Sequence, residues 1–195
     1  MINIAIFASG SGTNAENLIN YFRQHFNIRV CVVLTNNSQA GVIARAQSAN
    51  VPIHIFNRNE FYDTESVLEK LKEFQIDYIV LAGFLWLIPT YLIENFSQHI
   101  LNIHPALLPK YGGKGMYGMN VHRAVIENNE KQSGITIHEV DKEYDRGKII
   151  FQTTCDIVPN DTPESLAAKI HELEYRHFPA IVENWIVANN RDLRE

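Results

Sequence analysis

The stretch that decides the fold is Ile2–Asn14, INIAIFASGSGTN, in which an apolar run meets a turn with two glycines. Residues 2–8 are nearly all apolar and have the length of one buried strand. Residues 9–14 then break the run, and a helical pattern that carries Leu18 and Phe22 follows. A strand, a glycine turn and a helix in this order are how an α/β fold of the nucleotide-binding type usually opens.

Short buried strands continue to alternate with helices downstream of this opening. The expected strands are residues 30–34, 52–56 and 78–81, and the expected helices are about residues 40–49 and 64–74. Such alternation predicts a parallel sheet with right-handed crossovers. A fifth strand is expected at the apolar run Ile100–Ile103.

The pattern changes after this strand. Lys110–Asn120 is rich in glycine and lacks periodicity, so we expect a loop, followed by a helix at 121–129. Residues 134–140 and 148–154 predict an antiparallel hairpin. Thr162 and Pro163 are typical of a helix start, and a turn is expected at Pro179 before 181–187. We therefore predict one α/β domain over residues 1–195, with a mixed, mostly parallel sheet of about seven strands, a C-terminal antiparallel hairpin and a long final helix.

Composition limits the classes of partner. The chain has 46% hydrophobic and 20% charged residues and a formal net charge of −5, which is typical of a soluble globular protein and unlike a nucleic-acid-binding one. No apolar run approaches the roughly 20 residues that span a bilayer, and no basic segment precedes the first strand. Cys31 and Cys155 both lie in apolar, strand-like surroundings, which favours reduced core residues. We expect a cytoplasmic protein with small-molecule partners.

The turn Ser9–Asn14 is a candidate phosphate site. Backbone N–H groups at a glycine turn, topped by a helix N-terminus, form a concavity that suits an anion. The turn matches neither the dinucleotide fingerprint nor the Walker A loop, because it has no third glycine and no lysine after Gly12. A mononucleotide or sugar phosphate fits better than a dinucleotide. The alternative is a plain turn with Thr13 or Asn14 as the helix N-cap.

Asn102, His104 and Asp145 are the candidate catalytic residues. Asn102 and His104 alternate on an extended segment, so both side chains leave the same face, and Pro105 prevents a helix there. A histidine beside an ionised carboxylate has a raised pKa and can donate to a developing oxyanion, to which asparagine adds a neutral donor. Such a trio suits addition of an amine to a carbonyl carbon. Spacing alone does not bring Asp145 to His104, and the sequence pattern by itself favours a role for Asp145 in shaping the hairpin turn before Gly147.

The remaining histidines give weaker signals. His138 alternates with buried residues on a strand and points either at the site or at the sheet face. His171 and Glu174 stand three residues apart on one helix face, which is adequate to hold sugar hydroxyls but is common on solvated surfaces. No metal-ligand spacing occurs, so no metal is expected.

Four segments together resemble the folate-dependent formyltransferases over essentially the whole chain. They are Ser9–Asn14, Leu81–Phe84, the block from Asn102 to Pro109 with its Asn-Ile-His-Pro and Leu-Leu-Pro, and Tyr144–Gly147. The turn with Thr13 and Asn14 favours the branch of this family that acts on a ribonucleotide. The resemblance implies a Rossmann-like fold and formyl transfer from 10-formyltetrahydrofolate, as cosubstrate, to the amine of glycinamide ribonucleotide in purine biosynthesis.

The resemblance also assigns roles to individual residues. Asn102, His104 and Asp145 match the catalytic positions, with His104 as proton donor and Asp145 raising its pKa. Gly12, Thr13 and Asn14 match the segment that holds the substrate phosphate, and His171 and Glu174 match the helix near the ribose. The expected folate-pocket residues are Leu85, Trp86, Leu87, Ile88, Asn102, Val140, Asp141 and Tyr144.

The chain departs from the family pattern in the folate region. Leu85 and Trp86 stand where many members have Met-Arg, and Asp63–Glu65 replaces a segment that often carries an arginine. The segment Gly112–Met119 is longer than the turn of some members and is expected to fold over the ribonucleotide side. The resemblance leaves open how the folate tail is bound, and whether the protein is a monomer or a homodimer.

Other functions remain alternatives. Within the same chemistry, a methionyl-tRNA formyltransferase would need an extra C-terminal domain and a basic face, and a formyltetrahydrofolate deformylase would need an N-terminal regulatory domain. We expect a chain of 195 residues to have room for neither. From a different class, a non-catalytic Rossmann-type nucleotide-binding module would keep the phosphate turn but has no reason to carry the three candidate catalytic residues.

Overall fold

The computed structural model describes residues 1–192 and divides into two compact units, Met1–Leu101 and a second that begins at Asn102. The boundary falls inside strand β5 (Ile100–His104). The strand order is β3-β2-β1-β4-β5-β6-β7, so the expected mixed sheet of seven strands is confirmed. No helix in the described part of the chain is long and apolar enough to cross a membrane.

The first unit is built on parallel strands. β1 (Ile2–Phe7) pairs with β2 (Ile28–Thr35) on one side and with β4 (Tyr78–Leu81) on the other, and β3 (Ile53–Ile55) pairs with β2. The central strand is apolar on both faces because both faces are covered, and its residues from Ile4 onward are fully buried. The helices are α1 (Thr13–Phe22), α2 (Val42–Ser48), α3 (Arg58–Tyr62), α4 (Ser66–Glu73) and α5 (Thr90–Asn95).

Two of these helices and one helix cap differ from the sequence interpretation. The short helices α3 and α5 were not expected, because five or six residues are too few to show a helical period. α3 is marked instead by a capping box, in which Asn57 accepts from the Glu60 N–H and Glu60 accepts from the Asn57 N–H. The N-cap of α1 is Gly12, without a side-chain cap, so the alternative of Thr13 or Asn14 as the cap is wrong.

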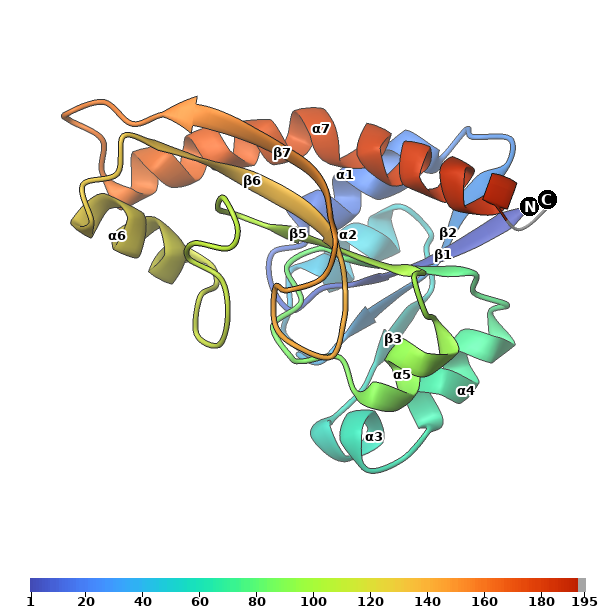
Figure 1. Ribbon diagram of the computed structural model, residues 1–195. Helices are drawn as coiled ribbons and strands as arrows, with labels where there is room; N and C mark the ends of the chain where they lie inside the picture. The colour runs from blue at the N-terminus through green and yellow to red at the C-terminus, as the bar shows by residue number, and fades with distance from the viewer. Residues whose placement is uncertain (193–195) are drawn as a thin grey trace. The chain divides into compact units, whose positions relative to one another are not determined.

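The second unit is an antiparallel hairpin packed on helices. β6 (Gln132–Glu139) pairs antiparallel with β7 (Ile149–Asp156), as predicted. α6 (Met119–Glu127) precedes the hairpin, and α7 (Pro163–Asp192) runs along it; Figure 1 shows this hairpin lying along α7. Phe178 and Val182 of α7 are fully buried.

The turn expected at Pro179 is absent, because α7 continues through this residue as one helix of 30 residues. A proline inside a helix removes one N–H donor and usually bends or ends the helix. Here Phe178 and Val182 on either side of it are completely buried, and Trp185 donates to Glu139 Oε1 at 3.1 Å. Burial on both sides of Pro179 therefore outweighs the missing hydrogen bond, and the predicted long final helix is confirmed.

Candidate functional site

The glycine turn lies in the first unit, between β1 and α1, and is shaped by a close approach to α2. Gly12 has φ +77°, and a Cβ at this position would lie 2.5 Å from Val42 Cα. Val42 N–H donates to Gly10 O at 3.2 Å. Glycine is therefore required at position 12 by packing within the protein. A Cβ at Gly10, in contrast, would meet no atom within 4 Å.

The segment after β4 and a side chain of α2 hold the same turn. Ser9 N–H donates to Gly83 O at 3.0 Å, and Ser9 Oγ accepts from Leu85 N–H at 3.1 Å. On the α2 side, Arg45 Nε donates to Ser11 O at 2.9 Å, and the Arg45 guanidinium pairs with Glu16. The backbone of the turn is thus fixed before any ligand binds. Thr13 and Asn14 are the first two residues of α1, at its positive end.

The expected folate-pocket residues of the first unit differ in exposure. Leu85 is 43% exposed, Trp86 and Leu87 are half-buried, and Ile88 is 3% exposed and belongs to the core. Trp86 joins a cluster of aromatic rings with Phe56 and Phe61. Of the four, Leu85 is the most exposed and Ile88 alone is buried.

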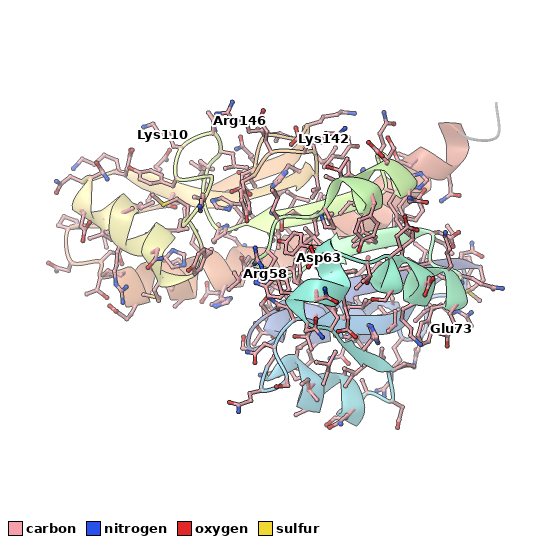
Figure 2. All side chains as sticks on the ribbon, turned by 90° about the horizontal axis from the view of Figure 1, so that it is seen from below. Arg58, Asp63, Glu73, Lys110, Lys142 and Arg146 are labelled. Atoms are coloured by element: carbon pink, nitrogen blue, oxygen red, sulfur yellow. The ribbon has the colours of Figure 1, made fainter. Side chains whose placement is uncertain are left out.

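An arginine not singled out from the sequence lies against Trp86. The Arg58 guanidinium stands 4.8 Å from the centre of the Tyr62 ring and 5.8 Å from that of Trp86. Figure 2 shows Arg58 and Asp63 near each other at helix α3. The rings hold this cation by cation–π attraction. Helix α3 thus places a cation beside Trp86.

In the second unit, the structure brings His104 and Asp145 together. His104 lies at the end of β5 and is 4% exposed, and its Nδ1 is 3.7 Å from Asp145 Oδ2. Asp145 is held by the Gly113 N–H, which donates to the same Oδ2 at 2.8 Å, and a Cβ added at Gly112 would lie 3.2 Å from Asp145 Cβ. Asp145 itself has φ +55° in the hairpin loop. It therefore shapes the loop and also faces His104.

The protonation of His104 differs from the expectation of a raised pKa. Burial lowers the pKa of His104 below its ordinary value, and this effect outweighs the Asp145 carboxylate and the Tyr111 carbonyl, which both raise it. His104 is therefore neutral near pH 7. Burial alone would raise the pKa of Asp145, but the imidazoles of His138 and His104 and the Gly113 N–H hold it below its usual range, so Asp145 is ionised.

The tautomer of His104 follows from its hydrogen bonds. Nε2 lies 2.7 Å from the Tyr111 carbonyl oxygen. A carbonyl only accepts, so Nε2 carries the proton and Nδ1 is the basic nitrogen. Nδ1 faces Asp145. In this state His104 can take up one proton at Nδ1, and the resulting imidazolium is then stabilised by the carboxylate.

His138, whose orientation the sequence leaves open, lies beside Asn102 and Asp145. It is 2% exposed, and its Nδ1 donates to Glu139 O at 2.8 Å. In the neutral ring Nε2 accepts from Asn102 Nδ2 at 3.0 Å, and in the charged ring Nε2 donates toward Asp145 Oδ1, 3.5 Å away. The position of His138 on the same strand face as Gly134 and Thr136 could have indicated this orientation, because that face also packs on the segment after β5.

Glu174 and His171 form an ion pair on α7. His171 Nδ1 is 3.0 Å from Glu174 Oε2, and the hydrogen bond with Glu174 raises the pKa of His171. The Glu174 side chain is 7% exposed and that of His171 is 57% exposed. The buried His122 of α6 lies near Glu174, whose charge acts on it, and burial lowers the pKa of His122. Glu174 thus brings a negative charge into the interior of the second unit.

The other expected folate-pocket residues lie in the loop between β6 and β7. Val140, Asp141 and Tyr144 are half-buried. Asp141 Oδ1 accepts from the Glu143 N–H at 2.9 Å and so shapes the loop. Lys142 and Arg146 of the same loop point outward in Figure 2. Within residues 1–192, no group of three His, Cys, Asp or Glu side chains is arranged to hold a metal ion.

Comparison with known proteins gives one family. Residues 2–182 match the family model described as formyl transferase. The chain is 31% identical over 196 residues to phosphoribosylglycinamide formyltransferase of Bacillus subtilis, covering 98% of both proteins. It is 37% identical over 185 residues to the chloroplastic phosphoribosylglycinamide formyltransferase of Arabidopsis thaliana, and spans 63% of the length of that relative.

Solved structures agree with these sequence matches. The phosphoribosylglycinamide formyltransferase of Bacillus halodurans superimposes with a TM-score of 0.84 at 36% identity, over 93% of this chain and 94% of that one. The enzyme of the same description from Streptococcus pneumoniae gives a TM-score of 0.84 at 34% identity, over 95% and 99% of the two chains.

Proposed function

This chain belongs to the formyl transferase family, and from that premise we propose that it transfers the formyl group of 10-formyltetrahydrofolate to the amine of glycinamide ribonucleotide. The observation that carries the proposal is the approach of a basic imidazole nitrogen to an ionised carboxylate, His104 Nδ1 to Asp145 Oδ2 at 3.7 Å, with Asn102 two residues earlier on the same strand. The products are formylglycinamide ribonucleotide and tetrahydrofolate.

The chemistry assigned to these residues is a direct transfer through a tetrahedral intermediate. The substrate amine attacks the formyl carbon, a C–N bond forms, and the formyl oxygen becomes an oxyanion. The Asn102 amide donates to this oxygen. His104 Nδ1 takes the proton that the attacking nitrogen releases, with Asp145 stabilising the imidazolium. The same proton then passes to N10 of the folate as the bond from N10 to the formyl carbon breaks.

Binding roles are assigned to each unit separately. In the first unit, Gly12, Thr13 and Asn14 would hold the substrate phosphate at the positive end of α1, and Leu85 and Trp86 would contact the folate. In the second unit, Glu174 and His171 would hold ribose hydroxyls, and Val140, Asp141 and Tyr144 would contact the folate. Glu174 is the stronger candidate because it is a buried carboxylate whose acceptor oxygens match hydroxyl donors.

The proposal extends to location and organisation. Both cysteines, Cys31 and Cys155, are free thiols, which supports a cytoplasmic enzyme. Its partners would be the two small-molecule substrates, and we propose that residues 1–195 act as one formyltransferase domain.

The deciding experiment is an assay of the purified protein with glycinamide ribonucleotide and 10-formyltetrahydrofolate. We expect formation of tetrahydrofolate that depends on the amine substrate. Tetrahydrofolate release without the amine would instead indicate a deformylase, and formylation from formate and ATP would indicate a different donor. Binding of the ribonucleotide without any turnover would indicate the non-catalytic binding module.

Two variants test the assigned chemistry. His104→Ala removes the proton acceptor, and we expect formyl transfer to fall by about a hundredfold or more while ribonucleotide affinity is kept. Asn102→Ala removes the oxyanion donor and should also lower kcat by about a hundredfold or more. Near-normal kcat in either variant would contradict the assignment for that residue.

A further inference from the structure

The imidazole of His104 is oriented by a main-chain group. His104 Nε2 donates to the Tyr111 carbonyl at 2.7 Å, in the segment that follows β5. This bond decides which nitrogen is basic, because the neutral ring has one proton and the carbonyl can only accept it. The position of the Tyr111 backbone therefore determines whether His104 presents Nδ1 toward Asp145.

The backbone of Tyr111 is in an unusual conformation. Its φ is +56°, in the left-handed region that bulky side chains seldom adopt. Such a conformation persists when surrounding contacts hold it in place. The next two residues are Gly112 and Gly113, and the Gly113 N–H donates to Asp145, but glycines have no side chain with which to hold a segment.

The side chain of Tyr111 provides an anchor. Its phenolic O–H donates to Glu130 Oε1 at 2.9 Å, and Lys110 Nζ lies 2.9 Å from the same oxygen. Glu130 follows α6 and precedes β6, so the anchor comes from a different part of the unit. The hydrogen bonds from Lys110 and Tyr111 hold the pKa of Glu130 below its ordinary value, so Glu130 is an ionised acceptor near neutral pH.

Lys110 contributes little by itself. It points outward from the segment after β5 in Figure 2, and its side chain is 69% exposed. An exposed lysine–carboxylate pair is screened by solvent and stabilises little. The hydrogen bond from the Tyr111 phenol to Glu130 has a larger role, because the main-chain carbonyl of Tyr111 holds His104.

We infer that Glu130 and the phenol of Tyr111 are positioning residues for formyl transfer, which act together by fixing the Tyr111 carbonyl that holds the Nε2–H tautomer of His104. The inference rests on the function proposed for His104. Glu130 contacts no reacting atom in this scheme. Its effect reaches the reaction through two hydrogen bonds, Glu130 to Tyr111 and Tyr111 to His104.

The first test is kinetic. Tyr111→Phe removes the phenolic donor and Glu130→Leu removes the acceptor, and we expect each to lower kcat by about fivefold to tenfold with little change in KM. Glu130→Gln keeps an acceptor oxygen and should restore most of the activity. The double variant should be no worse than either single one, since both break the same bond. Glu127→Gln, which changes an exposed carboxylate at the end of α6, is the matched control.

The pH profile separates this role from a general loss of stability. The groups that act on His104 are Asp145, Glu174, His138, His122 and the Tyr111 carbonyl. The carbonyl raises the pKa of His104, so loosening it lowers that pKa. The acid limb of kcat should therefore move to lower pH in Tyr111→Phe and Glu130→Leu and stay in place in Glu127→Gln. A lower kcat with an unchanged acid limb of the pH profile and a lower Tm would overturn the inference. A wild-type kcat in both Tyr111→Phe and Glu130→Leu would overturn it as well.

The second test needs no turnover. Nitrogen-15 NMR of the imidazole rings, with His104 assigned by comparison with His104→Gln, reports the tautomer directly. We expect Nε2–H in the wild-type protein and a mixture of tautomers in Tyr111→Phe and Glu130→Leu. An unchanged tautomer would overturn the positioning role even if formyl transfer is observed. A changed tautomer in a protein without formyl transfer would support the positioning role and contradict the proposed function alone.

Discussion

At the scale of single residues, the proposed chemistry depends on the charge states of His104 and Asp145. His104 is neutral because burial lowers its pKa, and Asp145 is ionised because its pKa lies below its ordinary value, with the Gly113 N–H donating to the carboxylate. The pair can therefore accept a proton. His104 would hold this proton as an imidazolium beside the Asp145 carboxylate. A histidine charged at rest would have to lose a proton before it could accept one.

Asp145→Asn tests this arrangement through pH. The Asp145 charge raises the pKa of His104, so its removal lowers that pKa further. We expect the acid limb of the kcat profile to move to lower pH and kcat to fall by about a hundredfold or more, measured from about pH 5 to about pH 8.5 at saturating substrates. Asp156→Asn, at the exposed end of β7, is the control. An acid limb that moves to higher pH would contradict the arrangement.

Substitution of the two glycines of the turn, Gly10 and Gly12, should affect stability differently. Gly12→Ala places a Cβ 2.5 Å from Val42 Cα at a positive φ, so the free energy of unfolding should fall by at least about 1 kcal/mol. Gly10→Ala meets no atom within 4 Å and should leave the urea midpoint unchanged. Equal stability of the two variants would contradict the packing role of Gly12. A bulky residue at position 12 therefore perturbs the fold before it reports on phosphate binding.

We expect Arg58 to contribute to the binding of an anionic folate tail. Its guanidinium lies over Tyr62 and Trp86, at the proposed folate wall. Arg58→Met keeps the length but removes the charge, and we expect KM for a polyglutamylated donor to rise about fivefold. KM for the monoglutamate should change less. Equal effects on both donors would mean that Arg58 supports the wall and does not bind the tail.

At the scale of elements, the start of α7 is stabilised by the carboxylate of Asp161, the residue before the N-cap Thr162. Asp161 accepts from the Val158 N–H at 2.8 Å and from Ser165 Oγ at 2.7 Å, and pairs with Lys169. These bonds lower the pKa of Asp161 from 3.8 to about 2. The sequence predicted this helix start from Thr162 and Pro163, because cap residues act over a few neighbouring positions.

The lowered pKa of Asp161 predicts that the stability of the fold depends on pH. A carboxylate whose folded pKa is depressed stabilises the fold above its unfolded pKa, and this contribution is lost as pH falls from 3.8 toward about 2. Asp161→Asn lacks the titrating group, so its Tm should lie below wild type at about pH 5 and approach wild type as the pH falls to about 2. A constant difference in Tm between the two proteins would contradict this account.

Two features of the helices could not be predicted from the local sequence. Strands and long helices were predicted because a buried face gives a period over several residues. The helix α3 and the continuity of α7 through Pro179 were missed. In the first case five residues are too short for a period, and in the second the burial of Phe178 and Val182 overrides the local preference of proline.

At the scale of the whole molecule, the prediction of one domain can be tested directly. The two compact units meet within β5, so one strand contributes residues to both. If residues 1–195 act as one domain, calorimetry should show one unfolding transition with equal calorimetric and van't Hoff enthalpies. Two resolved transitions, or a glycinamide ribonucleotide-induced shift of only one of them, would contradict it.

The sequence by itself determined the α/β class, the order of the strands along the chain, the antiparallel hairpin and the candidates Asn102 and His104. These rest on periodicity, turn residues and alternation, which are local properties of the chain. The tertiary structure decided which of the remaining polar groups meet. Asp145 reaches His104 across 41 positions, His138 turns toward Asn102, and the Tyr111 carbonyl selects the His104 tautomer. The tertiary structure also decides the protonation state of His104. Burial lowers the pKa of His104 and the Asp145 charge raises it, and His104 is buried only after the chain has folded around it.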